Sequence, residues 1–184
     1  METHIFKNEA DLYETLRIIG AMFKGDHVEI GTLNGKSAFI MAHARPSAHI
    51  YCVDPMEKQK ANDQYQGIKE TGHSAIFIKN REDEKLIEQI TLIQEYSLPW
   101  PLPPEQRFDT ALIDGYHVHP IPMWEFEILS KIVNGAIVID NADLFHLTGC
   151  ITKIRMTPGW VLEYAGKKVA VAWNEQWLLQ TGRV

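Results

Sequence analysis

The sequence predicts an α/β protein with a doubly wound, mostly parallel, seven-stranded sheet that ends in a C-terminal antiparallel hairpin. Five short apolar runs alternate with helical patterns along the 184 residues, which is typical of a parallel sheet with crossover helices. Two further runs within 159–173 are joined by a tight Ala-Gly-Lys turn, which predicts the hairpin. We expect a single domain, with an N-terminal helix in 1–24, a core in 25–175 and a tail in 176–184.

Each expected element has its own pattern of apolar residues. The first helix has Leu12, Leu16 and Ile19 at helical spacing, with Asn8 as its N-cap and Gly25 beyond its end. The strands are short apolar runs bounded by turn residues. In chain order, the expected elements are a helix over 8–23, a strand over 27–31, a helix over 35–45, a strand over 48–54, a mobile polar segment over 57–72, a strand over 74–79, a helix marked by Leu86, Ile87, Ile90 and Ile93, a proline-rich loop over 98–106, a strand over 108–114, a helix marked by Trp124, Ile128, Leu129 and Ile132, a strand over 135–141 and the hairpin.

Composition and charge argue against several classes of partner. The chain has 45% hydrophobic and 23% charged residues, and its net charge of −6 comes without a Lys/Arg cluster that would hold nucleic acid or an anionic membrane. We therefore expect a small-molecule partner. The N-terminus does not resemble a signal peptide, and no apolar run is long enough to span a membrane. The two cysteines, Cys52 and Cys150, form no disulfide framework. We therefore expect a cytoplasmic location.

The stretch EIGTLNGKS, which begins at Glu29, ends like a phosphate-binding loop but lacks its first glycine. A Walker loop is G-x-x-x-x-G-K-[ST], and the position of its first glycine is Ile30 here. The dinucleotide fingerprint G-x-G-x-x-G fails as well, because Ile30 and Thr32 flank a single Gly31. What remains is E-x-G-x-x-x-G-x-S after a strand. The Glu29 carboxylate, together with Asp54 placed to bind ribose hydroxyls at the next strand end, suits a nucleoside that bears a positive charge.

Three stretches together resemble class I S-adenosylmethionine (SAM)-dependent methyltransferases. They are VEIGTLNGKSAFIMA, FDTALIDGYHVHP and KIVNGAIVIDNAD, at 28–42, 108–120 and 131–143. Their form is similar to that in catechol O-methyltransferase and in the bacterial group of sugar O-methyltransferases and cephalosporin hydroxylases. The resemblance extends over residues 25–175. It implies a Rossmann-like fold, SAM as cofactor and methyl transfer to a hydroxyl oxygen of a small molecule.

The resemblance also implies which residues bind the cofactor. Glu29 and Ser37 match the positions that hold the methionine part of SAM, above a loop of glycines. Asp54 matches the acid that binds the ribose. Asn80-Arg81 would follow the third strand, where the family has a small residue and then a polar one. The full implied set is Glu29, Gly31, Thr32, Gly35, Ser37, Asp54, Met56 (against adenine), Asn80, Arg81 and Asp114.

Asp114, Asp140 and Asn141 match the three ligands of the divalent metal in the catechol-type enzymes. All three offer hard oxygen donors, which suit Mg²⁺, and such an ion would hold a substrate hydroxylate in place. His117, three residues after Asp114, occupies the position of the family's basic lysine. An ordinary imidazole has a pKa of about 6.5 and takes up a proton near neutral pH. We therefore expect His117 and Asp114 to be catalytic.

The resemblance is less specific about the substrate. We expect the acceptor pocket to be built from 116–124, 142–149 and the proline-rich loop. Only one N-terminal helix is expected over the cofactor, so the site is either more open than in the catechol-type enzymes or completed by a second subunit of a homodimer.

Several alternatives stay open from the sequence. The chain could be a metal-independent methyltransferase, a SAM-binding module without catalysis, or a nucleotide hydrolase that uses its Gly-Lys-Ser. A zinc site at His117 and His119 with a carboxylate is a weaker alternative. Lys36 is expected to be a solvated helix residue. The aromatic residues Trp124, Trp173 and Trp177 are expected in the core or an interface.

Overall fold

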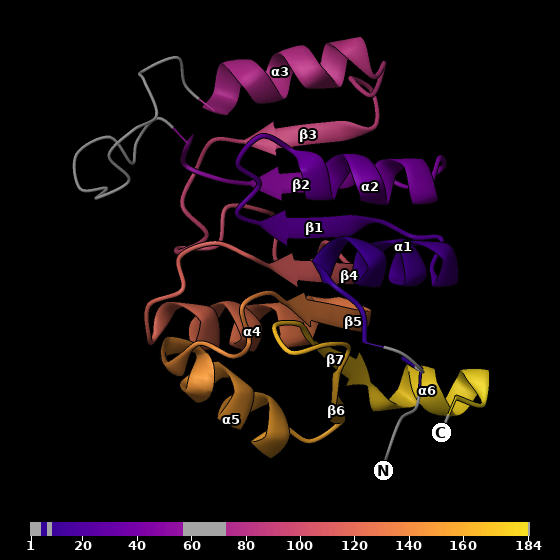
Figure 1. The fold of residues 1–184 in the computed structure, drawn as a ribbon, viewed down its shortest axis with the longest axis vertical. Helices are drawn as coiled ribbons and strands as arrows, with labels where there is room; N and C mark the ends of the chain where they lie inside the picture. Colours follow the sequence, from indigo (N-terminus) through magenta and orange to yellow (C-terminus); the bar gives the residue numbers. More distant parts are fainter. Residues whose placement is uncertain (1–4, 7–8, 57–72, 184) are drawn as a thin grey trace.

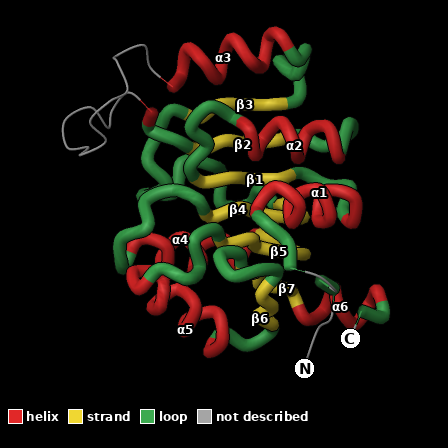
Figure 2. Tube along the Cα trace, in the orientation of Figure 1, coloured by secondary structure: helices red, strands yellow, loops and turns green. Residues whose placement is uncertain are grey.

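The computed structural model describes residues 5–6, 9–56 and 73–183, which form one sheet between two layers of helices (Figure 1, Figure 2). The strand order is β3-β2-β1-β4-β5-β7-β6. The first five strands are parallel, and β7 runs antiparallel to both of its neighbours. The predicted fold is confirmed. The strands are β1 (His27–Ile30), β2 (Ile50–Val53), β3 (Ile90–Ile93), β4 (Phe108–Ile113), β5 (Val133–Ile139), β6 (Trp160–Tyr164) and β7 (Ala170–Asn174).

Two apolar clusters divide the helices between the faces of the sheet. One cluster joins α1, α2, α3 and α6 to one face, and the other joins α4 and α5 to the opposite face. Trp100 and Leu102 of the proline-rich loop pack against the second cluster, where no described helix lies between β3 and β4. The helices are α1 (Leu12–Met22), α2 (Lys36–Ala44), α3 (His73–Asp83), α4 (Ile121–Ile132), the 3₁₀ turn η2 (Phe145–Leu147), α5 (Thr148–Met156) and α6 (Glu175–Thr181).

The first helix begins later than predicted. Asp11 is the N-cap, because its side chain accepts a hydrogen bond of 2.9 Å from the backbone N–H of Glu14. The predicted cap, Asn8, lies outside the described residues, as does the segment 57–72 that was expected to be mobile. Leu16 and Ile19 are fully buried, so the predicted inner face of the helix is confirmed.

A buried arginine fixes the other end of α1. Arg45, which follows α2, donates hydrogen bonds to the backbone carbonyls of Ile19, Gly20 and Gly25 at distances of 3.3, 3.1 and 3.0 Å. Carbonyls at a helix C-terminus lack partners within the helix and carry partial negative charge, so a guanidinium group suits them. Arg45 therefore ties α1 to α2, on the side of the sheet that covers the start of β1.

The sequence prediction fails between residues 74 and 93. The run 74–79, predicted as a strand, lies in α3, and the residues predicted to mark the next helix include β3. From Ile76 to the end of α3, the range whose side chains are described, only Phe77 is buried, whereas Ile76 and Ile78 are 43% and 40% exposed. The apolar runs in this segment are too short to distinguish a helix from a strand. Ile90 and Ile93, for example, lie in a strand but are also spaced by three residues, as on one face of a helix. The other predicted strands are confirmed.

The C-terminal part adds two helices that the sequence did not predict. α5 and α6 are both short, and α6 begins directly after β7 with Asn174 as its cap. Trp173 is fully buried and stacks on Trp177, which in turn stacks on Phe23. Of the three tryptophans expected in the core or an interface, Trp173 lies in the core, Trp177 is partly buried against it, and Trp124 is 44% exposed. Within the ranges described, no helix is both long and apolar enough to cross a membrane.

Candidate active site

The predicted site residues gather at the carboxyl ends of neighbouring strands. The strand order reverses between β1 and β4, and in open α/β sheets ligands bind at such a point, beyond the carboxyl ends of the strands. Several residues with positive φ lie in the loops at this edge. Non-glycine residues adopt this conformation rarely, and it concentrates at functional sites. The positive-φ residues at this edge are Gly31, Leu33, Gly35, Met56 and Asn141.

Two glycines shape the loop between β1 and α2. Gly31 has a φ of +82°, and a Cβ at this position would overlap the backbone carbonyl of Asp114 at the end of β4. Gly35 has a φ of +89° and is the N-cap of α2, where a Cβ would come within 2.7 Å of the rings of Phe77 and Phe39. Both positions therefore require glycine, and the loop lies directly against β4.

Glu29, in β1, presents a buried carboxyl group at the base of this loop. Its side chain is fully buried, and neither carboxyl oxygen has a hydrogen-bond partner of good geometry among the described residues. Burial raises the pKa of Glu29 to about 8, an effect that the nearby Ser37 hydroxyl and Cys52 thiol offset only in part. A buried carboxyl group without partners favours a cationic ligand, because a nearby positive charge stabilises its ionised form.

Asp54 holds the glycine loop in place. Its Oδ2 accepts hydrogen bonds from the backbone N–H groups of Thr32 and Leu33 at 2.8 and 3.0 Å, and its Oδ1 accepts one of 2.7 Å from Met56. The sequence suggested only a contact with ribose hydroxyls, so this anchoring role was missed. The carboxylate oxygens retain further acceptor capacity, and the ribose contact stays a prediction. Met56 is buried in the first apolar cluster.

Lys36 is exposed, as predicted, but it also contacts α1. Its Nζ lies 3.9 Å from the centroid of the Tyr13 ring, which is a cation–π arrangement. The lysine of the Gly-Lys-Ser sequence therefore contacts an aromatic ring of the N-terminal helix. Ser37 beside it is buried and close to Glu29.

Asp114 and Asp140 bring two carboxylates together at the ends of β4 and β5. These strands are paired, with Ile113 opposite Ile139. Burial and the negative charge of Asp114 raise the pKa of Asp140 to about 6. Asn141 follows with a φ of +52°. The structure therefore brings the three predicted metal ligands to neighbouring strand ends, and the two acids interact electrostatically.

His117 lies beside this pair of acids. Its Nε2 is 3.4 Å from Oδ1 of Asp114, whereas its Nδ1 is buried without a hydrogen-bond partner among the described residues. The sequence analysis missed a third acid near it, Glu125 in α4. Glu125 is 1% exposed, accepts a 2.6 Å hydrogen bond from Ser97, and has a pKa that burial raises and His117 lowers. The sequence did contain a signal for its burial, because Glu125 lies next to Phe126 on the apolar face of the helix that includes Leu129.

Asn80 and Arg81 do not occupy the predicted position. They lie in α3 rather than after the third strand, so the reason for including them in the cofactor-binding set was wrong. The side chain of Arg81 donates to the carbonyl of Ile90, and the amide of Asn80 donates to Asn34 in the glycine loop at 3.5 Å. The residues that follow β3 are Gln94 and Glu95.

The chain matches a family model described as "Methyltransferase domain" over residues 28–142, which is more than half of its length. The chain belongs to this methyltransferase family. The matched region begins in β1 and ends just after Asn141, so it includes the glycine loop and the acids at the ends of β4 and β5. Among curated proteins, no match was found.

Several solved structures, two of them O-methyltransferases, share the fold of this methyltransferase. The O-methyltransferase TomG from Streptomyces achromogenes, in complex with SAM, is 14% identical, with a TM-score of 0.62 over 92% of this chain and 82% of that one. The O-methyltransferase from Bacillus cereus, in complex with SAH, is 17% identical, with a TM-score of 0.58 over 88% and 77%. Cofactor-bound Rv0187 from MTB is 18% identical, with a TM-score of 0.68 over 95% and 84%. At these identities the likeness establishes the fold.

These comparisons confirm the class I methyltransferase family and the enzyme class predicted from the sequence. The metal is a separate question. In the part of the methyltransferase that the structure describes, no group of three or more His, Cys, Asp and Glu side chains could hold a metal ion. The zinc alternative with His117 and His119 therefore gains no ligand set. The predicted magnesium ligands are two aspartates and an asparagine, Asn141. Asparagine is not one of the four residue types in that statement, so it does not test this ligand set.

Proposed function

We propose that this methyltransferase uses SAM to methylate a hydroxyl oxygen of a small molecule, with a divalent metal ion, Mg²⁺, at the acceptor side. The observation that supports it most directly is the buried carboxyl group of Glu29 at the base of the glycine loop, which receives no well-aligned hydrogen bond from the described residues. SAM carries positive charge on its ammonium and sulfonium groups. TomG and the Bacillus cereus enzyme, which share the fold, were solved with SAM and SAH.

The residues of the loop suit such a donor. A cation next to Glu29 lowers the pKa of its carboxyl group and ionises it, which removes the energetic cost of its burial. Gly31 and Gly35 let the loop pack against the Asp114 carbonyl and the Phe77 and Phe39 rings, and Asp54 fixes its course through Thr32 and Leu33. The loop is one residue too short for a phosphate grip, which argues against the nucleotide hydrolase.

The acid pair supports a metal ion on the acceptor side. Asp114 and Asp140 repel each other, and a divalent cation between them would relieve this repulsion. Asp114, Asp140 and Asn141 would hold it through oxygen atoms, as Mg²⁺ prefers. When bound, the ion would polarise the acceptor hydroxyl and stabilise its negative charge.

His117 is the group that would take the proton of the acceptor hydroxyl. Asp114 lies 3.4 Å from its Nε2 and would stabilise the imidazolium that forms. As the oxygen–methyl bond forms and the sulfur–methyl bond breaks, the hydroxyl proton passes to the imidazole. Orientation of the two substrates in such a site is worth about 7–11 kcal/mol of the barrier.

Exposed apolar side chains surround the acceptor side of the site. Tyr116 and Val118 follow β4, and Leu144 and Phe145 follow β5, with exposed fractions from 41% to 87%. The ring of His119 packs against Gly149, so the loop after β4 contacts the first turn of α5. We propose that these loops, predicted as the acceptor pocket, contact the body of the methyl acceptor.

The test compares Asp140→Ala with the matched variant Asp143→Ala, since Asp143 is exposed three residues further along. Mn²⁺ binding, followed by electron paramagnetic resonance, is expected to fall at least tenfold in Asp140→Ala and to stay unchanged in Asp143→Ala. Methyl transfer from labelled SAM to a panel of hydroxylated small molecules is expected to fall in parallel. Unchanged transfer in Asp140→Ala would favour the metal-independent alternative. SAM binding with no transfer to any acceptor would favour the non-catalytic module.

A further inference from the structure

The outer edge of β6 is open in the described part of the chain. β6 is the last strand in the sheet and pairs only with β7. The Glu175 N–H donates to the Gly159 carbonyl, so Gly159 and Glu175 form a hydrogen-bonded pair of the ladder. Two residues further along, Val161 and Trp173 form the next such pair. Since residues alternate in an antiparallel ladder, every second residue of β6 directs its backbone N–H and C=O away from β7. These residues are Trp160, Leu162 and Tyr164.

This edge lacks three of the features that commonly prevent strand pairing, namely proline, lysine and a bulge. The strand, WVLEY, contains neither proline nor lysine, and its pairing with β7 shows no bulge. Its residues are half-buried to exposed, and Tyr164 is 46% exposed. An edge of this kind is a template for another strand.

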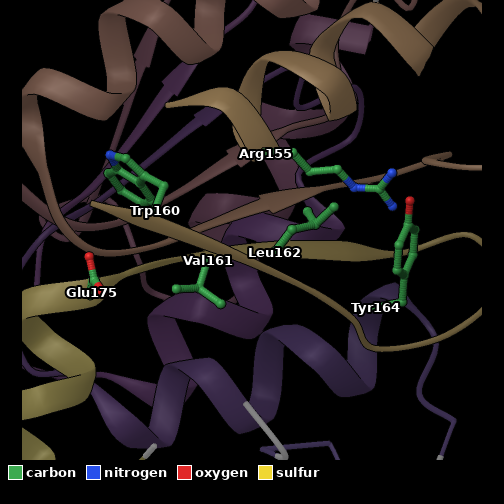
Figure 3. A pocket seen from close by; sticks show the side chains of 6 residues that line it. All are labelled: Arg155, Trp160, Val161, Leu162, Tyr164 and Glu175. Carbon is green, nitrogen blue, oxygen red and sulfur yellow. The ribbon is translucent and has the colours of Figure 1, made fainter. Parts of the chain in front are cut away.

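A depression of about 450 Å³ lies along this open edge (Figure 3), and none of the predicted site residues is among those that line it. Its ends carry opposite charges. Glu175 lies at the Trp160 end, and Arg155 lies at the Tyr164 end. Neither side chain forms a salt bridge with another residue in the ranges the structure describes. The depression is lined by Arg155, Trp160, Val161, Leu162, Tyr164 and Glu175.

We propose that β6 pairs with β6 of a second copy of this chain, antiparallel and centred on Leu162, to form a homodimer. A two-fold axis at Leu162 exchanges the two ends of the depression, so Arg155 of one subunit meets Glu175 of the partner subunit. The same register places Trp160 opposite Tyr164 of the partner subunit, an aromatic cross-strand pair, and lets the outward N–H groups of Leu162 and Tyr164 bond to the partner strand; the Trp160 N–H already donates to the Thr157 carbonyl at 3.3 Å. A second copy is thus the occupant that both the charges and the backbone groups fit. This pairing does not depend on the proposed reaction.

Charge reversals at Arg155 and Glu175 test the dimer, and the double variant controls for any effect of the single changes on folding. Sedimentation equilibrium of the full chain is expected to show a concentration-dependent dimer. Arg155→Glu and Glu175→Arg each place like charges together at both ends, so each single change is expected to raise the dissociation constant about tenfold. The double variant restores opposite charges and is expected to dimerise like the original chain. A monomer at all concentrations, or a dimer that ignores the swaps, would overturn the proposal.

Hydrogen exchange then locates the interface. In the dimer, the amide N–H groups of Leu162 and Tyr164 are expected to be protected as protein concentration rises. Those of Val161 and Glu163, which face β7, are expected to change little. Concentration-dependent protection elsewhere, with none at Leu162 and Tyr164, would show that the subunits associate through another surface and would refute this one.

Discussion

Glu29 places a carboxyl group inside the sheet where no described residue gives it a well-aligned hydrogen bond. Such a group destabilises the protein unless a ligand satisfies it. A destabilising group in the middle of the sheet is explained if Glu29 serves to bind a ligand rather than to stabilise the fold. Functional sites commonly violate the rules that the rest of a fold obeys, and the loss of stability is made up elsewhere in the fold.

Replacing Glu29 by Gln should therefore stabilise the ligand-free protein at neutral pH. The folded-state pKa of about 8 exceeds the ordinary value of 4.5. Below about pH 4.5 the Glu29 carboxyl group is protonated in both the folded and the unfolded state, so its ionisation does not affect stability. Between about pH 4.5 and pH 8 the carboxyl group ionises only in the unfolded state, so the free energy of unfolding falls as pH rises. At pH 7 this loss is about 3 kcal/mol, and Glu29→Gln should recover most of it.

Urea unfolding at several pH values measures this difference. The gain in Glu29→Gln should grow between about pH 4.5 and pH 8 and be absent at the acid end. Glu88, which is exposed, supplies the control, because Glu88→Gln should show no such pH dependence. A gain that is constant with pH would mean that ionisation of Glu29 is not its cause.

Asp140 should make metal affinity depend on pH. Its pKa of about 6 means that a divalent ion must displace a proton below that pH. Mn²⁺ affinity should rise between about pH 5 and pH 7 and then level off. Isothermal titration at constant ionic strength measures it, and a flat profile over this range would contradict the assigned ligand.

The loop between β1 and α2 depends on glycine for two separable reasons. Gly31 and Gly159 have almost the same φ, +82° and +81°, but a Cβ at Gly159 meets nothing within 4 Å, whereas one at Gly31 would overlap the Asp114 carbonyl. Gly159→Ala should cost about 1 kcal/mol through its backbone conformation alone. Gly31→Ala should cost clearly more and should also weaken SAM binding. Equal losses in urea unfolding would show that β4 does not constrain this loop.

Arg45 should account for much of the stability of the α1–α2 contact. It is 2% exposed, and Arg45→Met would leave carbonyl groups at the end of α1 without their charged donor. We expect a loss of about 3 kcal/mol in the free energy of unfolding. Arg17→Met removes an exposed arginine that pairs only locally with Glu14, so it should change stability by less than about 0.5 kcal/mol. Similar losses in both variants would contradict the capping role of Arg45.

Elements with an unambiguous pattern could be predicted from the sequence, and those with mixed patterns could not. The strands β4 and β5 are buried runs bounded by clear turn signals, and both were predicted within two residues. The segment from His73 to Ile93 failed, because its short apolar runs fit both periods and the choice depends on tertiary contacts. Phe77, for example, packs on Phe39 and Gly35 only because α3 covers that end of the sheet.

The candidate site shows the same division. Strand ends in a parallel sheet meet at one edge, so Glu29, Asp54, Asp114 and Asp140 could be predicted to gather there. The partners of each side chain could not be predicted, because they lie far apart in the sequence. The hydrogen bonds from the glycine loop to Asp54, and the buried Glu125 near His117, depend on how α4 and β2 pack in the complete fold.

The sheet as a whole explains why one edge gathers the predicted metal ligands and most of the predicted methyl-donor residues. In the strand order, the glycine loop after β1 is one strand away from Asp114 after β4 and two strands away from Asp140 after β5. A cationic donor at Glu29 and an acceptor at Asp114 and Asp140 would then face each other across Gly31. The open edge of β6 lies beyond β7, on the other side of β5 from this site.

The central claim, that Glu29 receives the positive charge of SAM, is tested most directly by proton release on binding. At pH 7 the carboxyl group of the free protein is largely protonated, since its pKa is about 8, and a bound cation would ionise it. Calorimetry of SAM binding in two buffers with different ionisation enthalpies should therefore show the release of close to one proton. Binding without proton release, or tight binding of ATP in place of SAM, would contradict it.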